Sequence, residues 1–236
     1  MDTADPHRLV LFDIDGTLLT AGGLGGRAML AAIKGVSGHT VDVDGYSYGG
    51  RTDPQIIREL LERAGLPAAE IAGLRPRILA RYVDELERLL RGSRRPRLFA
   101  GVRELLARLE REPSVVVGLL TGNVEAAACL KLDHFGIRHC FHAGAFGSDD
   151  EDRGALVGIA LERAHAATGV RFAPQQVCLV GDTPRDVDCA RRGGTRVVAV
   201  ATGPFGLEEL ARSAPDQLFS TLEPTERVVA ALLDGC

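Results

Sequence analysis

Among the five cysteines, no two have the Cys-x-x-Cys spacing of zinc and redox sites, and an odd count does not suit a framework of paired disulfides. The sequence also lacks an apolar run long enough to span a membrane, and the polar stretch up to His7 gives no sign of a signal peptide. Internal repeats and low-complexity tracts are absent as well. These absences exclude a disulfide scaffold and a membrane-spanning protein, and we expect a protein of the reducing cytoplasm.

Basic residues are scattered rather than clustered, and the formal net charge is −4. The densest basic stretch, Arg91–Arg97, is short and typical of a solvated helix end. We therefore expect no nucleic-acid partner, and any phosphate must be bound by a few local groups. A length of 236 residues, with 45% hydrophobic and 25% charged residues, suits one large globular domain or a medium domain with an insert.

Apolar runs followed by short polar motifs predict strands that are buried on both faces. They lie at Arg8–Asp13, Ser114–Leu120, Val177–Val180 and Arg196–Ala201, with a weaker candidate at Phe141–Phe146. Helical patterns lie between them, at Val102–Glu110, from just after Asn123 to His134, at Gly154–Ala167 and at Pro184–Arg192. This alternation predicts an α/β fold with a Rossmann-like parallel sheet and helices on both faces.

The segment from residue 20 to residue 95 breaks the alternation because it is mainly helical, with helices predicted over Arg27–Val36, Asp53–Ala64 and Pro67–Arg91. The glycine run Gly22–Gly26 lacks the Lys-Ser/Thr of a P-loop, so we interpret it as a flexible hinge. A second hinge is expected near residues 92–96. We therefore expect residues 1–19 and 96–236 to form the catalytic core, and residues 20–95 to form an inserted helical cap domain.

Polar groups follow three of the predicted strands. Asp13 and Asp15 follow the first strand, and Gly16 allows the sharp turn there. Thr121-Gly122-Asn123 follows the second and precedes a helix, whose free N–H groups would make a seat for an anion. Asp182 and Asp186 follow the third. Open α/β sheets bind ligands at the carboxyl ends of their strands, so these motifs should converge.

Four acidic residues in one small site require a cation. Like charges about 4 Å apart repel by roughly 4 kcal/mol per pair at an effective dielectric near 20. All the candidate ligands of Asp13, Asp15, Asp182 and Asp186 are oxygen atoms, which favours a hard ion such as Mg²⁺ over zinc. Taken separately, each motif also fits a turn or a helix cap, so the inference depends on their combination.

With these motifs in this order, the chain resembles the haloacid dehalogenase superfamily, in its phosphoglycolate phosphatase-like branch with a helical cap. The resemblance covers most of the chain, and three motifs in order, each after its own strand, are a specific signal. It implies that Asp13 is the nucleophile and that Asp15 is the general acid and base. Mg²⁺ would be held by Asp13, the backbone carbonyl of Asp15 and Asp182, with Asp186 orienting them or touching the ion weakly. Thr121 and the amides of Gly122 and Asn123 would bind phosphate.

The family also uses a basic residue, most often lysine, beside the nucleophile. The matching region, residues 148–154, has no lysine, and Arg153 is our candidate because arginine can donate two hydrogen bonds to phosphate. Lys131 is the fallback, although its place inside a helix favours a surface role. In the cap segment, Arg51 is a candidate substrate contact, with a simple turn before a helix as the alternative.

The resemblance predicts a Mg²⁺-dependent phosphatase that hydrolyses a small phosphate monoester through an aspartyl-phosphate. Its expected partner is a small phosphorylated metabolite, and its expected state is a monomer or homodimer. A dehalogenase is disfavoured because Asp15 and Asp182 are present. A phosphomutase of the same superfamily stays open, as does a non-catalytic phospholigand-binding protein.

Overall fold

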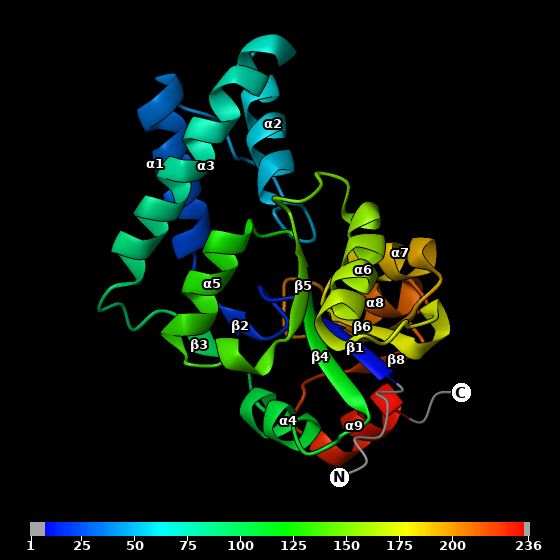
Figure 1. The fold of residues 1–236 in the computed structure, drawn as a ribbon. Coiled ribbons are helices and arrows are strands. Elements are labelled where there is room, and N and C mark those ends of the chain that lie inside the picture. Colours follow the sequence, from blue (N-terminus) through cyan, green and yellow to red (C-terminus); the bar gives the residue numbers. More distant parts are fainter. Residues whose placement is uncertain (1–7, 234–236) are drawn as a thin grey trace.

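The computed structural model describes residues 8–233, so Cys236 and the polar stretch up to His7 lie outside the described residues. Its main sheet has six parallel strands in the order β5-β4-β1-β6-β7-β8 (Figure 1). The strands are β1 (Arg8–Phe12), β4 (Val115–Thr121), β5 (Ala143–Phe146), β6 (Val177–Gly181), β7 (Arg196–Val200) and β8 (Gln217–Phe219). The prediction located the first five, whereas it missed the short edge strand β8.

Side chains of the central strand alternate between two cores. Val10 and Phe12 pack with α4 (Val102–Leu109), α5 (Glu125–His134) and α9 (Thr225–Leu233) on one face of the sheet. Leu9 and Leu11 pack with α6 (Leu156–Thr168) and α7 (Pro184–Gly193) on the other. The short helix α8 (Leu207–Arg212) lies between β7 and β8 in the chain. Helices on both faces explain why the strands are apolar throughout, and they confirm the predicted Rossmann-like α/β fold.

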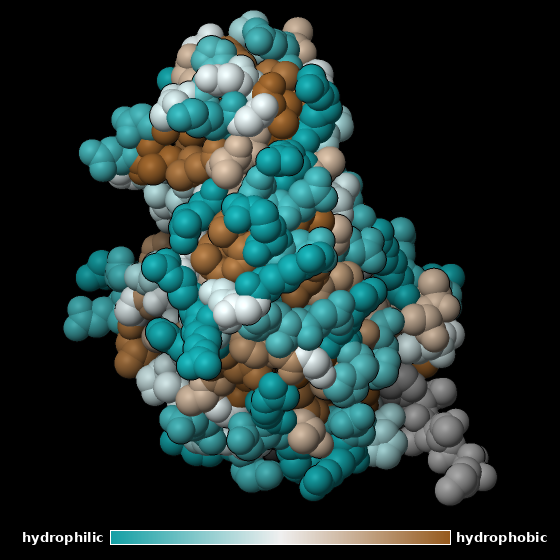
Figure 2. Space-filling view, turned by 90° about the vertical axis from the view of Figure 1, so that its left-hand side faces the viewer, coloured by the Kyte–Doolittle hydropathy of each residue, from teal (hydrophilic) through white to brown (hydrophobic). Residues whose placement is uncertain are grey.

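Three helices form a separate bundle beyond the sheet, at the top of Figure 1. They are α1 (Leu24–Ser37), α2 (Asp53–Arg63) and α3 (Ala68–Leu90), and we call them the three-helix unit. Its own hydrophobic core includes Ile33, Ile57 and Leu86, all fully buried. On the face drawn in Figure 2, hydrophobic residues also show through the mostly hydrophilic surface of this upper part. The three-helix unit thus has a core distinct from the two that flank the sheet.

A two-stranded antiparallel pair lies where the chain leaves the sheet region and where it returns. It joins β2 (Leu19–Thr20) to β3 (Arg97–Leu98). The predicted domain boundaries fall at this pair.

Local chemistry accounts for both ends of α2. The Thr52 hydroxyl accepts a hydrogen bond from the backbone N–H of Gln55 and so caps α2, and Gly65 follows this helix with a φ of 84°. The predicted hinge at Gly22–Gly26 is partly wrong, because Leu24 already begins α1 and the last two glycines lie in its first turn. Gly22 and Gly23 do take positive φ angles and form the turn before the helix.

Within residues 8–233, no helix combines the length and apolar character that crossing a bilayer requires.

Candidate active site

Asp13 lies directly after the central strand, and its residue is 5% exposed. Its backbone N–H donates to the carbonyl of Val180 on the neighbouring strand, 2.9 Å away. The turn that follows depends on Gly16, which has a φ of 88°. A Cβ atom on Gly16 would lie 2.2 Å from Oδ2 of Asp182, so glycine is also what allows the first and third motifs to approach.

Three buried acids meet at the ends of β1 and β6. Carboxylate oxygens of Asp13, Asp182 and Asp186 lie within 4.8 Å of one another. Burial raises the pKa of Asp13 from 3.8 to about 6, while Arg153 lowers it and Asp186 adds to the rise. Burial, reinforced by Asp186 and Asp13, also raises the pKa of Asp182 well above its usual range. Three carboxylates that repel one another and offer oxygen ligands fit a hard divalent cation.

Hydrogen bonds hold the two acids of the third motif in place. The Thr17 hydroxyl donates to Oδ1 of Asp182 at 2.9 Å. Oδ2 of Asp186 accepts from the backbone N–H of Thr183 at 2.9 Å and from its hydroxyl at 2.7 Å, which closes a capping box at the start of α7. The helix-cap interpretation of Asp186 is therefore correct as well, and its Oδ1 is the oxygen that pairs with Arg153.

Arg153 supplies the positive charge beside these acids. It lies in a short 3₁₀ turn, Arg153–Ala155, ahead of α6, and it is 7% exposed. Its Nη2 lies 3.1 Å from Oδ2 of Asp13 and 2.5 Å from Oδ1 of Asp186. Burial opposes its charge, but the two acids raise the pKa of the guanidinium above its usual range. Within the described residues, its buried Nε has no hydrogen-bond partner.

The second motif ends β4 and connects the acids to α5. Thr121 is fully buried, and its hydroxyl oxygen accepts from Nδ2 of Asn123 at 2.9 Å. Nδ2 of Asn123 also donates to Oδ2 of Asp15, again at 2.9 Å. The expected row of free N–H groups is not present, because several are already bonded within the protein. Asn123 N donates to the Thr121 hydroxyl, Val124 N to Asp53, and Glu125 N to the Ser148 hydroxyl.

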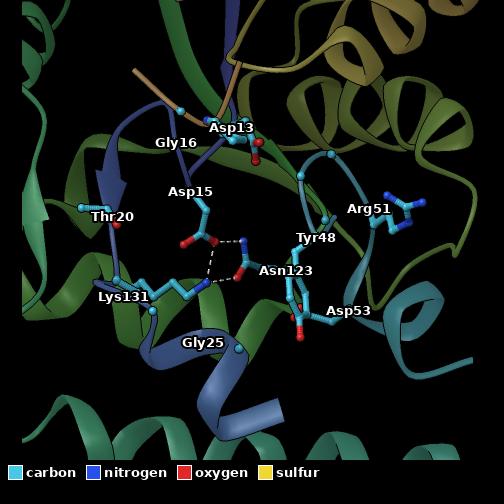
Figure 3. Close-up of a pocket in the computed structure, with 18 of the residues that line it drawn as sticks. Asp13, Asp15, Gly16, Thr20, Gly25, Tyr48, Arg51, Asp53, Asn123 and Lys131 are labelled. Atoms are coloured by element: carbon cyan, nitrogen blue, oxygen red, sulfur yellow. Dashed lines mark hydrogen bonds and ion pairs between the residues drawn. The ribbon is translucent and has the colours of Figure 1, made fainter. Parts of the chain in front are cut away.

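The surface role expected for Lys131 is wrong. It is 4% exposed, and its Nζ lies 2.5 Å from both Oδ2 of Asp15 and Oδ1 of Asn123. Figure 3 shows this lysine, Asp15 and Asn123 joined at the centre of the pocket. The helix that carries Lys131 contacts α3, so the side that the sequence suggested was open to solvent is covered by the three-helix unit.

A loop of the three-helix unit docks directly on the second motif. The backbone N–H of Asp53 donates to the carbonyl of Gly122 at 2.7 Å, and Oδ2 of Asp53 accepts from Val124 N at 2.8 Å. The Thr52 hydroxyl donates to the carbonyl of Glu151 at 3.0 Å. Burial raises the pKa of Asp53 from 3.8 to about 7, although the charge of Lys131 lowers it.

Arg51 lies in the same loop and lines the pocket, but its guanidinium is engaged elsewhere. Nε donates to Glu59 at 2.8 Å, and Nη1 donates to the carbonyl of Ser47 at 2.6 Å. In Figure 3 the guanidinium points away from Asp13 and Asp15. The substrate contact expected from the sequence stays a prediction, and it would require Arg51 to release Glu59.

The motifs and the three-helix unit enclose a cavity of about 650 Å³. Asp13, Asp15, Asp182, Lys131 and Arg153 line it on the sheet side. Its other wall is largely apolar and includes Met29, Tyr48, Ile56, Tyr82 and Phe99. A polar floor of carboxylates and cationic side chains below an apolar wall can bind a small ester and keep bulk water out.

The family model for haloacid dehalogenase-like hydrolases matches residues 7–194. The chain belongs to the haloacid dehalogenase-like hydrolase family. The family expected from the sequence is thereby confirmed.

Two relatives share about a third of their aligned residues with this hydrolase. Phosphoglycolate phosphatase of Synechococcus elongatus is 30% identical over 226 residues, which cover 95% of this chain and 98% of that protein. Tyrosine-protein kinase PtkA of Mycobacterium tuberculosis is 32% identical over 198 residues, or 83% of this chain. Those residues are 62% of PtkA, so the haloacid dehalogenase-like hydrolase described here spans less than two thirds of that relative.

A solved structure shares the fold of this haloacid dehalogenase-like hydrolase over nearly its whole length. The crystal structure of a predicted phosphoglycolate phosphatase from Haemophilus somnus matches with a TM-score of 0.69 at 21% identity. The match covers 94% of this chain and 97% of the other. The family and the Synechococcus relative support a phosphatase as the class of enzyme.

Proposed function

We propose that this hydrolase is a Mg²⁺-dependent phosphatase that cleaves a small phosphate monoester through an aspartyl-phosphate on Asp13. The proposal rests on the groups that surround Asp13. Its carboxylate lies at the floor of the cavity, beside the Arg153 guanidinium and two further acids. A carboxylate held in this way can attack phosphorus while the neighbouring cation balances charge.

Two proton transfers by Asp15 complete the reaction. In the first step an oxygen of Asp13 bonds to phosphorus, the bond from phosphorus to the ester oxygen breaks, and Asp15 gives its proton to that oxygen. In the second step Asp15 takes a proton from water, the water oxygen bonds to phosphorus, and the bond from phosphorus to Asp13 breaks. Inorganic phosphate leaves, and both aspartates return to their starting states.

The remaining groups bind and orient phosphate. Asp13, the backbone carbonyl of Asp15 and Asp182 would hold Mg²⁺, with Asp186 beside them, and the ion would supply positive charge next to the phosphate oxygens. The Thr121 hydroxyl and the backbone N–H of Gly122 are the proposed phosphate donors, and the backbone N–H of Asn123 would join them only by releasing the Thr121 hydroxyl. The unpartnered Nε of Arg153 supports a further hydrogen bond to phosphate.

We assign the three-helix unit, within residues 20–95, as a cap over the core of residues 1–19 and 96–236. The cavity of about 650 Å³ between them favours a small ester, and the Synechococcus relative makes phosphoglycolate the first substrate to test. The loop at Arg51 is the proposed part of the cap that contacts the leaving group.

The test is phosphate release from a panel of small phosphate esters, with Mg²⁺ and with excess chelator, for the wild type and for Asp13→Asn. We expect release that the chelator and the substitution both abolish, with the variant still folded. Unchanged release by Asp13→Asn would remove Asp13 as nucleophile. Interconversion of sugar phosphates without release would instead support the phosphomutase, and ligand binding without turnover would support a phospholigand-binding protein.

A further inference from the structure

Lys131 is unusual in this chain because it is a buried lysine in a protein that hardly uses lysine. The sequence contains only two, Lys34 and Lys131, against 26 arginines. Lys34 is exposed on α1, whereas Lys131 is 4% exposed. A buried ammonium is costly unless it is paired, so the partners of Lys131 indicate why it lies there.

Those partners converge on one oxygen of Asp15. Nζ of Lys131 and Nδ2 of Asn123 both donate to Oδ2, at 2.5 Å and 2.9 Å. Lys131 also bonds Oδ1 of Asn123 at 2.5 Å, which fixes the orientation of that amide. Oδ1 of Asp15 has no partner in the described part of the chain, and the side chain is 42% exposed toward the cavity. The fixed oxygen therefore leaves the other one free for proton exchange (Figure 3).

We infer that Lys131, together with Asn123, is a positioning residue that holds Asp15 for proton transfer to the leaving group. The inference rests on the proposed phosphatase function. An exposed aspartate would otherwise occupy several rotamers, and few of them would direct an oxygen at the ester. When Asp15 gives its proton from Oδ1 to the ester oxygen, the charge of Lys131 lies beside the carboxylate that remains.

A purely structural role for Lys131 makes a different prediction. Asp53 is a second buried carboxylate near this lysine, and Lys131 could serve only to balance its charge. In that case replacing the lysine would slow every substrate alike, through lost stability or a distorted cap. A positioning role predicts a loss that depends on how much the leaving group needs a proton.

The experiment compares an alkyl phosphate, phosphoglycolate, with p-nitrophenyl phosphate, whose phenolate leaves without protonation. For Lys131→Met we expect kcat/KM, which reports the steps up to formation of the aspartyl-phosphate and not its later hydrolysis, to fall by about 100-fold or more on the alkyl ester, within the usual range for general acid catalysis. On the aryl ester we expect a loss below roughly 10-fold, since that step needs no acid. Lys34→Met, the other lysine, is the matched control and should change neither rate.

A second pair of variants tests whether Lys131 acts through Asp15. Asp15→Asn should show the same selective loss, and adding Lys131→Met to it should cost little more, because residues that act as a unit are not additive. Asn123→Ala, which leaves the lysine in place, should reproduce the pattern more weakly. It also provides the test if Lys131→Met does not fold.

Equal losses on both esters, or additive losses in the double variant, would overturn the positioning role while leaving the phosphatase intact. An inactive wild type with Mg²⁺ present would instead refute the proposed function, and the inference with it.

Discussion

Nη2 of Arg153 lies 3.1 Å from Oδ2 of Asp13. The same nitrogen reaches Oδ1 of Asp186 at 2.5 Å, so one guanidinium links the proposed nucleophile to the third motif. An arginine also carries Nε, which has no hydrogen-bond partner within the described residues and which a lysine lacks, so the two basic residues are not equivalent at this position. The arginine and its two acids form a buried network in which each member balances the others.

Replacing Arg153 should therefore damage both stability and turnover. Arg153→Ala leaves buried carboxylates without their cation and should lower the free energy of unfolding by about 3–5 kcal/mol, as removal of one partner of a buried pair does. Arg153→Lys should fold and keep partial activity, reduced by about 10- to 100-fold, as is typical for residues that orient ligands of a metal. Urea denaturation and steady-state kinetics measure the two effects.

The matched control is Arg192, which pairs with Asp152 on the surface of the same region with half of its side chain exposed. Arg192→Ala should cost less than about 1 kcal/mol, since exposed pairs contribute little. An equal cost at both positions would contradict the network.

Metal binding at the acid cluster should stabilise the folded protein. Mg²⁺ at 100 times its dissociation constant should add about 2.7 kcal/mol, visible as a rise in Tm by calorimetry that a chelator reverses. Asp182→Asn should lose most of this rise, because one of the three clustered carboxylates is gone. Asp188→Asn changes an exposed acid of α7 outside the cluster and should keep it. The same rise in both variants would place the ion elsewhere.

The raised pKa of Asp53 predicts that the free energy of unfolding depends on pH. Burial raises its pKa from 3.8 to about 7, so its contribution is fully present below pH 4 and is lost as the pH rises through 7. One pH unit corresponds to about 1.4 kcal/mol, so the loss is on the order of 4 kcal/mol. Asp53→Asn keeps an oxygen for the N–H of Val124 but cannot ionise. Its free energy of unfolding, minus that of the wild type, should therefore increase between pH 4 and pH 7. A constant difference across that window would refute the shift.

Whether a feature of the structure could be predicted from the sequence depends on whether neighbouring residues in the chain determine it. The strands and the motifs after them were predictable, because buried parallel strands are apolar throughout and their carboxyl ends share one edge of the sheet. The capping of α2 by Thr52 was equally local. The edge strand Gln217–Phe219 was not predicted, because it is short and partly exposed and so has no continuous apolar run.

Features set by contacts between distant segments could not be predicted from the sequence. The burial of Lys131 depends on α3, which covers the helix that carries it. The pairing of Arg51 with Glu59 depends on how a loop folds back on its own helix. The N–H groups after Thr121 appeared free because their partners, Asp53 and Ser148, come from two other parts of the chain. A single sequence has no local signal for such contacts.

A substitution at Gly122 tests how tightly the three-helix unit docks on the core. A Cβ atom there would lie 2.1 Å from the carbonyl oxygen of Arg51, so Gly122→Ala must push the loop away and weaken both hydrogen bonds of Asp53. Overpacking of this kind costs about 1–3 kcal/mol, and trypsin should cut the loosened loop at Arg51 faster. Gly158→Ala, with open space around its Cβ, should instead be neutral or stabilising by up to about 1 kcal/mol. Unchanged cleavage in a folded Gly122→Ala protein would mean that the loop does not depend on this contact.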